Sequence, residues 1–139
     1  MSTALIMQLI TVMALIEGIP PETALTIAKM ESNFNMKAVG LAGEVGTFQI
    51  LKSSSKYSKT KLRNPLVNVK EGIRMLKEAK ANCVHQKDNT WVLCYNLGHT
   101  GAKKIKQPKK FPYYIKYVQN KEQLREKFKN YKKLMYVKE

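Results

Sequence analysis

The stretch from Pro21 to Gln49 reads PETALTIAKMESNFNMKAVGLAGEVGTFQ, and it decides how the rest of the chain is interpreted. Pro21 and Glu22 form a favourable first turn of a helix, which the apolar residues behind them continue to about Glu31. The next segment, 33–46, contains three glycines and is predicted to be a loop. A carboxylate at the end of an apolar helix therefore stands at the start of a glycine-rich loop.

Further segments carry apolar residues at helical spacing, and strand patterns are almost absent. They are 4–16, a helix opened by Asn64-Pro65, one or two turns at 90–95, and a long basic helix or helix pair at 112–137. The first segment is apolar nearly all round, which predicts a helix buried in the core. Gly98 is expected to end the turns at 90–95 and to begin a basic loop that reaches Pro112. The pattern predicts a mostly α fold with little or no β structure.

The chain has 139 residues, the size of one ordinary domain. We expect one domain over residues 1–120 and a basic helical extension over residues 121–139 that packs on it. The apolar segment 4–16 is too short to span a bilayer comfortably. It also lacks the preceding basic residues and the cleavage site of a signal peptide, so we expect neither a transmembrane segment nor a signal peptide.

The charge is strongly positive and is concentrated toward the C-terminus. The chain has 25 Lys and Arg against 10 Asp and Glu, a net charge of +15, and residues 103–139 hold thirteen of the basic and three of the acidic residues. Such a charge attracts polyanions over a long range, and salt weakens the attraction. Nucleic acid, anionic lipid and anionic cell-wall polymers all fit, and charge alone does not choose among them.

Two cysteines, Cys83 and Cys94, have a spacing that fits neither a metal knuckle nor a redox pair. Outside a reducing cytosol they could form a disulfide, which we favour, and otherwise they are two partly buried free thiols. His85 and His99 are not placed as a metal-binding pair or as part of a catalytic triad. We expect no metal and no organic cofactor.

Glu31 is the carboxylate with the most unusual predicted surroundings. A carboxylate at the C-terminal end of a helix feels the negative end of the helix dipole, and apolar neighbours remove it from water. Both effects raise its pKa, as required of a general acid that must hold its proton near neutral pH. The alternative is an ordinary solvated glutamate at a helix end, the more common case for such a residue taken alone.

The residues around Glu31 and further along the chain form an ordered set of short motifs. They are Glu31-Ser32-Asn33-Phe34-Asn35, Ala38-Val39, Ala42-Gly43, Gly46-Thr47-Phe48-Gln49, Asn64-Pro65, Asn68 and Gly72 ahead of Met75-Leu76, Cys94-Tyr95-Asn96-Leu97-Gly98, and Tyr117-Val118. In this order and spacing they resemble the soluble lytic transglycosylase domain of the lysozyme-like superfamily. The resemblance covers roughly residues 1–120.

The resemblance implies that Glu31 is the sole catalytic acid and base. It also implies substrate contacts for six further residues: Ser32, Phe48, Gln49, Tyr95, Asn96 and Tyr117. In this picture Phe48 forms an apolar wall of the cleft and Gln49 hydrogen-bonds the sugar. Taken singly, Tyr95 could instead be a core aromatic residue, and Gln49 and Asn96 could be amides that stabilise turns.

The chain departs from the pattern of the family at several positions. Gly40-Leu41 stands where the family usually has Ser-Pro, so a hydroxyl that could orient the catalytic carboxyl is missing. Thr47 replaces a leucine, and Cys94 and Leu97 both replace alanines. These changes bear on the fine geometry of the site.

The resemblance implies a lytic transglycosylase that cleaves between N-acetylmuramic acid and N-acetylglucosamine of peptidoglycan and leaves a 1,6-anhydro end. One alternative is a lysozyme-type muramidase in which Glu44, in the loop facing the expected cleft, assists an activated water. Glu44 is otherwise a loop residue that pairs with a lysine, and we retain it as a candidate substrate contact. A third hypothesis, from a different class, is a basic module that binds nucleic acid through the tyrosines and lysines of 113–136.

We therefore expect peptidoglycan glycan strands as the main partner of a monomeric protein. Anionic envelope polymers are expected to bind the basic C-terminal region, and nucleic acid is not expected as the main ligand. The expected place of action is the periplasm or the cell wall. The missing signal fits a phage-encoded enzyme or the mature form of an exported protein.

Overall fold

The computed structural model describes the backbone of residues 1–137 and the side chains of residues 1–129. The α-helices in this part of the chain are α1 (Thr3–Glu17), α2 (Pro21–Ser32), α3 (Lys59–Leu62), α4 (Pro65–Asn82), α5 (Val92–Lys103) and α6 (Pro112–Val137). Among these residues the β structure is limited to two isolated bridges, which pair Val39 with Val45 and Val45 with Ile50. The prediction of a mostly α fold is confirmed.

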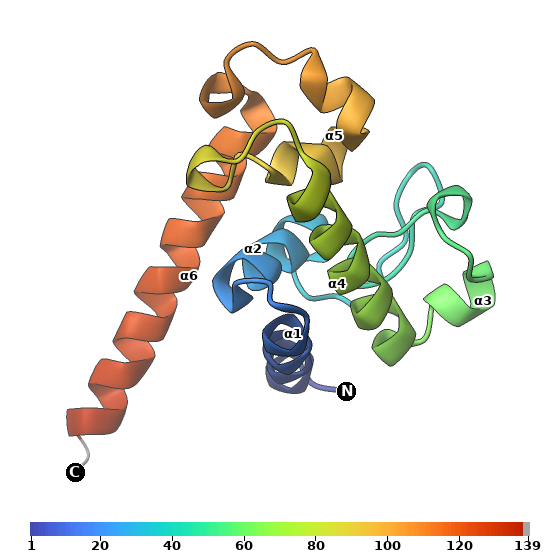
Figure 1. Cartoon of the computed structure of the whole chain (residues 1–139). Coiled ribbons are helices and arrows are strands. Elements are labelled where there is room, and N and C mark those ends of the chain that lie inside the picture. Colours follow the sequence, from blue (N-terminus) through green and yellow to red (C-terminus); the bar gives the residue numbers. More distant parts are fainter. Residues whose placement is uncertain (138–139) are drawn as a thin grey trace.

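Helix α4 lies near the middle of the molecule (Figure 1). Helix α1 packs on α2 and on α4, α5 packs on α4, and α6 runs along one side of the molecule and packs on α2. Short 3-10 turns lie in the connections: Lys52–Ser54, Lys87–Asn89 and Pro108–Lys110. Helix α6 thus contacts both α2 and α5.

Local signals set the ends of α1. The Ser2 hydroxyl accepts a hydrogen bond from the N–H of Leu5 at 3.2 Å, and Gly18 ends the helix in a left-handed conformation with φ 72°. A strained backbone at this φ is avoided because glycine has no Cβ. The buried residues of the helix share one face: Ile6, Ile10 and Ala14.

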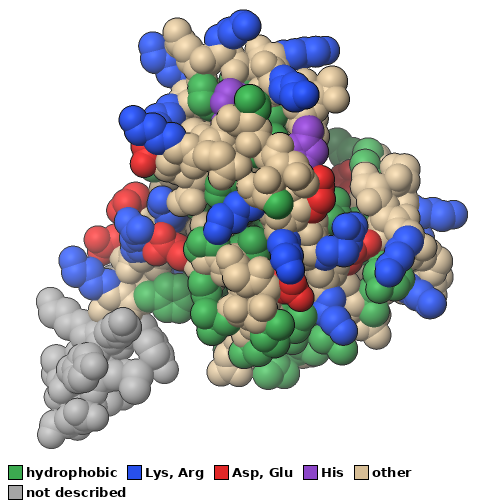
Figure 2. All heavy atoms as spheres, viewed as in Figure 1, with side chains coloured by type: hydrophobic (Ala, Val, Ile, Leu, Met, Phe, Trp, Pro, Cys, Tyr) green, Lys and Arg blue, Asp and Glu red, His purple; other side chains and the backbone are tan. Residues whose placement is uncertain are grey.

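The opposite side of α1 is open to solvent, which corrects the prediction that this helix is buried nearly all round. Leu5 is 49% exposed, Val12 53%, Leu15 65% and Ile16 67%. Because α1 packs on α2 and α4, only the side that faces them leaves water. Figure 2 shows the apolar side chains gathered at the edge of the molecule where α1 lies.

Helix α5 is interrupted by one residue with non-helical backbone angles. It begins directly after Trp91, which is buried, and Gly98 interrupts it with φ 73° and ψ 165°. The chain then resumes helical geometry and α5 ends at Lys103. The prediction that a loop begins at Gly98 is therefore wrong for residues 99–103.

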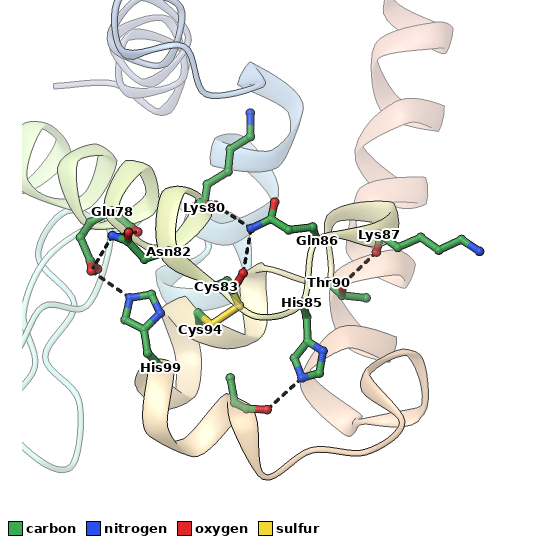
Figure 3. Close-up of a disulfide and its surroundings, with 11 residues drawn as sticks. Glu78, Lys80, Asn82, Cys83, His85, Gln86, Lys87, Thr90, Cys94 and His99 are labelled. Carbon is green, nitrogen blue, oxygen red and sulfur yellow. Dashed lines mark hydrogen bonds and ion pairs between the residues drawn. A yellow bond between two sulfur atoms is a disulfide. The ribbon is translucent and has the colours of Figure 1, made fainter.

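Cys83, directly after α4, and Cys94, in α5, form a disulfide whose Cα atoms are 5.8 Å apart. Figure 3 shows this bond between the C-terminal end of α4 and the first turn of α5. A second link joins the same two helices nearby, because Nε2 of His99 lies 2.8 Å from Oε1 of Glu78. The two links hold α5 against α4 at the position of its motif residues.

Helix α6 is one continuous helix rather than a helix pair. The hydroxyls of Tyr117 and Thr23 lie 2.9 Å apart, and the Arg125 guanidinium donates to the Glu22 carboxylate at 2.7 Å. Both contacts join α6 to α2. The boundary predicted at residue 120 falls inside this helix, and residues 138–139 of the predicted extension lie outside the described residues.

Candidate active site

Helix α2 ends directly after Glu31 and Ser32. Asn33 stops the helix, because it takes a left-handed conformation with φ 51° and its N–H donates to the carbonyl of Lys29 at 2.8 Å. The hydroxyl of Ser32 donates to the carbonyl of Thr47 at 2.7 Å and so ties the last turn of α2 to the loop. Glu31 is thus held at the junction between α2 and the glycine-rich loop.

The environment of Glu31 favours its neutral form. Burial, the larger effect, and the negative charge of Glu44 raise the pKa of the Glu31 carboxyl from 4.5 to about 7. No hydrogen bond from the described residues stabilises the carboxylate and offsets these effects. At neutral pH both protonation states of Glu31 are therefore populated, as required of a group that acts first as an acid and then as a base.

The side chain of Glu44 lies over the backbone of Gly40. A Cβ atom at position 40 would lie 1.4 Å from Oε1 of Glu44 and 2.2 Å from its Cδ. The N–H of Gly40 also donates to the carbonyl of Glu44 at 2.8 Å. The carboxyl of Glu44 therefore fills the space that a side chain at position 40 would take, and it does so close enough to affect Glu31.

Asn68, which is fully buried on α4, anchors the loop to this helix by hydrogen bonds. Its Oδ1 accepts a hydrogen bond from the N–H of Phe48 at 2.9 Å, and its Nδ2 donates to the carbonyls of Val45 at 2.9 Å and Leu62 at 2.8 Å. The ring of Phe48 packs directly on Gly72, where a Cβ atom would lie 2.3 Å from it. The sequence motif containing Asn68 and Gly72 thus positions the loop by two hydrogen bonds and one packing contact.

Gln49 uses its amide inside the loop. With φ 49°, it places Nε2 so that it donates to the carbonyls of Ala38 at 3.1 Å and Gly46 at 3.0 Å. Both amide hydrogens are therefore committed, and the side-chain oxygen is the atom left for a ligand. Gln49 acts here as an amide that stabilises a turn.

Tyr95 and Asn96 belong to the motif Cys94-Tyr95-Asn96-Leu97-Gly98, which lies on α5. The Tyr95 hydroxyl donates to the carbonyl of Phe48 at 3.3 Å, and burial together with the negative charge of Glu31 raises the pKa of this hydroxyl. Tyr95 is therefore close to Glu31 in space, whereas Asn96 is exposed. Both residues line a pocket of about 420 Å³, whose other lining residues include Arg74, Glu78 and His99.

A family sequence model described as the transglycosylase SLT domain matches residues 8–117. The match starts in α1, ends in α6 at Tyr117 and contains the motifs from Glu31 to Gly98. The chain belongs to the transglycosylase SLT family. A comparison with curated proteins finds no match. The resemblance seen in the sequence is confirmed, and the chain has a lytic transglycosylase-type domain that acts on peptidoglycan.

In the described structure Glu31, Glu44 and Tyr95 lie close together, whereas two predicted substrate contacts lie in the core. Phe48 is 0% exposed because its ring packs on Gly72. Tyr117 is also 0% exposed, because it is packed between α6 and α2 with its hydroxyl on Thr23. We therefore assign both residues to the core, against the prediction that they contact a ligand.

The sequence analysis missed Tyr113 as a residue of the site in this SLT domain. Its hydroxyl is buried, and burial together with the charge of Glu31 raises its pKa. The signal that could have found it is its spacing, since it lies four residues before Tyr117 and so on the same face of α6.

Among the described residues no helix is both long enough and apolar enough to cross a membrane.

Proposed function

We propose that this SLT domain is a lytic transglycosylase that cleaves the β-1,4 bond between N-acetylmuramic acid and N-acetylglucosamine, with Glu31 as its only catalytic acid and base. The observation that carries this proposal is the pKa of Glu31, raised to about 7. An acid of this strength holds a proton at neutral pH and, once it has given the proton away, is basic enough to take one back.

The reaction requires one proton-transfer group used twice. Glu31 donates its proton to the glycosidic oxygen, the bond from that oxygen to C1 of the muramic acid breaks, and N-acetylglucosamine leaves with a hydroxyl. The Glu31 carboxylate then takes the proton of the muramic acid C6 hydroxyl, whose oxygen bonds to C1. No water is consumed, and the nucleophile is already held next to C1 within the same sugar.

The surroundings of Glu31 support substrate roles for neighbouring residues. We propose that Tyr95 and Asn96 bind the sugar beside Glu31, since Tyr95 is close to the carboxyl and Asn96, the next residue, is exposed. Ser32 contributes through the loop, because its hydroxyl is bonded to Thr47. Gln49 contributes through its side-chain oxygen, since its amide hydrogens are committed within the loop.

A second candidate function is favoured by the position of Glu44. Its carboxyl is near enough to raise the pKa of Glu31, and a second carboxylate across a sugar can activate water for hydrolysis. In that case the enzyme is a muramidase that cleaves the same bond and leaves a reducing end. The nucleophile distinguishes the two functions: the muramic acid C6 hydroxyl in the first and water in the second.

The deciding experiment digests purified peptidoglycan in water enriched in heavy oxygen and analyses the products by mass spectrometry. We expect 1,6-anhydro ends without heavy oxygen, no products from Glu31→Gln, and products of unchanged type from Glu44→Gln. Reducing ends that carry heavy oxygen, lost in Glu44→Gln, would instead establish the muramidase. Glu17→Gln, which removes a carboxylate that pairs with Lys77, is the matched control and should retain activity.

We propose that the protein acts in the periplasm or the cell wall, where peptidoglycan lies, and two features support this proposal. The disulfide between Cys83 and Cys94 is a bond that persists outside a reducing cytosol. The net charge of +15 favours binding to the anionic polymers of the envelope. We propose that the basic residues of the C-terminal region, rather than the site around Glu31, provide most of that binding.

A further inference from the structure

The hydroxyl of Tyr113 is buried and has no hydrogen-bond partner among the described residues. Buried polar groups in folded proteins nearly always have a partner, because an unsatisfied one loses its bonds to water without replacement. The unpaired Tyr113 hydroxyl therefore needs an explanation. One explanation is that the hydroxyl gains a hydrogen-bond partner only at a certain step of the reaction.

Two contacting helices carry Tyr113 and Glu31. Tyr113 lies one turn before Tyr117 on α6, and the Tyr117 hydroxyl contacts Thr23 on α2 at 2.9 Å. Glu31 lies about two turns after Thr23 on α2. The charge of Glu31 also raises the pKa of Tyr113, after the larger effect of burial.

Tyr113 is the tyrosine of this cluster whose hydroxyl is uncommitted. The hydroxyl of Tyr95 already donates to the carbonyl of Phe48 at 3.3 Å, and that of Tyr117 is paired with Thr23. The carboxyl of Glu31 receives no hydrogen bond from the described residues. A buried donor without an acceptor thus lies beside a carboxyl without a donor.

We propose that Tyr113 is a positioning residue for Glu31, whose hydroxyl donates a hydrogen bond to the carboxylate after Glu31 has given up its proton. The proposal rests on the proposed role of Glu31. The bond holds the carboxylate in place while it waits to accept the second proton. Because it stabilises the charged form, it also limits how far burial raises the pKa of Glu31.

The test is Tyr113→Phe in the full chain, measured on soluble glycan strands over a range of pH. We expect kcat to fall roughly tenfold and KM to stay nearly constant, since a hydrogen bond to a charged group is lost. The alkaline midpoint of the pH profile should move to higher pH by about half a unit to one unit. The matched control is Tyr114→Phe, which removes a hydroxyl that donates to the carbonyl of Asp88 at 2.7 Å and should leave the midpoint unchanged.

A titration of Glu31 by carboxyl-labelled NMR in the unliganded protein gives a readout that does not depend on turnover. The proposal is overturned if the midpoint of Glu31 is the same with and without the Tyr113 hydroxyl, even when kcat falls, because that result describes a packing role only. If the phenylalanine variant does not fold, 3-fluorotyrosine at position 113 keeps the volume, makes the donor stronger and should lower the midpoint. The proposed function fails separately, if Glu31→Gln remains active.

Discussion

At the scale of single residues, the site depends on a carboxylate kept away from water and on a second carboxylate nearby. Glu31 has its pKa raised to about 7 by burial and by Glu44. Gly40 makes the approach of Glu44 possible, since any side chain there would overlap the Glu44 carboxyl. The glycine that replaces the serine of the family pattern and the glutamate four residues later therefore act together. The loss of one side chain makes room for the other.

Gly40→Ala tests this link. A Cβ at position 40 would push the end of the flexible Glu44 side chain aside, so its charge would act less on Glu31. We expect the alkaline midpoint of the kcat/KM profile to move to lower pH by about half a unit. The double variant with Glu44→Gln should show no further shift. A midpoint that stays at its wild-type value in Gly40→Ala would contradict the assigned contact.

The raised pKa of Glu31 also predicts how stability changes with pH. The folded state binds the Glu31 proton more tightly than the unfolded state, in which the pKa of this carboxyl is 4.5. The folded state therefore loses stability as the pH rises from 4.5 to about 7. Glu31→Gln removes this loss because glutamine does not ionise. We expect the variant to be more stable than wild type by about 2–3 kcal/mol at pH 8 and nearly equal to it at pH 4. Urea unfolding at the two pH values measures the difference, and equal differences would exclude a buried Glu31.

At the scale of elements, the loop after α2 depends on α4 and α5 for its shape. Asn68 of α4 accepts from one loop N–H and donates to one loop carbonyl, and the Tyr95 hydroxyl of α5 donates to another. Helix α5 is in turn fixed to α4 by the disulfide between Cys83 and Cys94. Since Cys94 directly precedes Tyr95, the disulfide constrains the residue that lies beside Glu31.

Reduction of the disulfide should lower stability. The bond closes a short loop with a sequence separation of 11, for which the loss of unfolded-state entropy corresponds to about 2–3 kcal/mol. We expect the midpoint of thermal unfolding to fall in the presence of a thiol reductant. The double variant Cys83→Ser with Cys94→Ser should unfold at the lower temperature with or without reductant. An unchanged midpoint in fully reduced wild-type protein would show that the bond contributes little.

At the scale of the whole molecule, the candidate active site and the basic C-terminal part of α6 lie in different parts of the fold. Glu31, Glu44 and Tyr95 lie close together, near Tyr113 in the first turn of α6. The basic residues of α6, by contrast, continue toward its C-terminal end, which extends away from the other helices (Figure 1). The side chains of Lys132 and Lys133, predicted to bind the wall, lie outside the described residues.

The lysines of α6 are expected to control binding to the cell wall. We expect replacement of Lys116, Lys127 and Lys129 by glutamine to weaken sedimentation with purified walls at low salt, and to have less effect at high salt. The three side chains are exposed, so folding should not suffer. Replacement of the same residues by arginine keeps the charge and is the matched control. Equal sedimentation of the glutamine and arginine variants would count against an electrostatic role for α6.

Local sequence signals predicted much of the fold and the position of Glu31 within it. Asn64-Pro65 marked the start of α4, Gly18 marked the end of α1, and Glu31 was placed at the end of α2. These features depend on backbone preferences and hydrogen bonds within a few residues, which neighbours in the chain determine. The order of the motifs also indicated the SLT family, which the match over residues 8–117 confirms.

Tertiary structure alone decided which sides of these elements are buried. Val12 and Ile16 are as apolar as Ile6, yet they are exposed because α2 and α4 cover only one side of α1. Tyr117 lies in the core and Tyr113 lies beside Glu31 because α6 packs on α2, two helices about ninety residues apart. The burial and the pKa of a side chain depend on atoms that distant segments of the chain bring together. The neighbouring residues in the sequence therefore do not determine them.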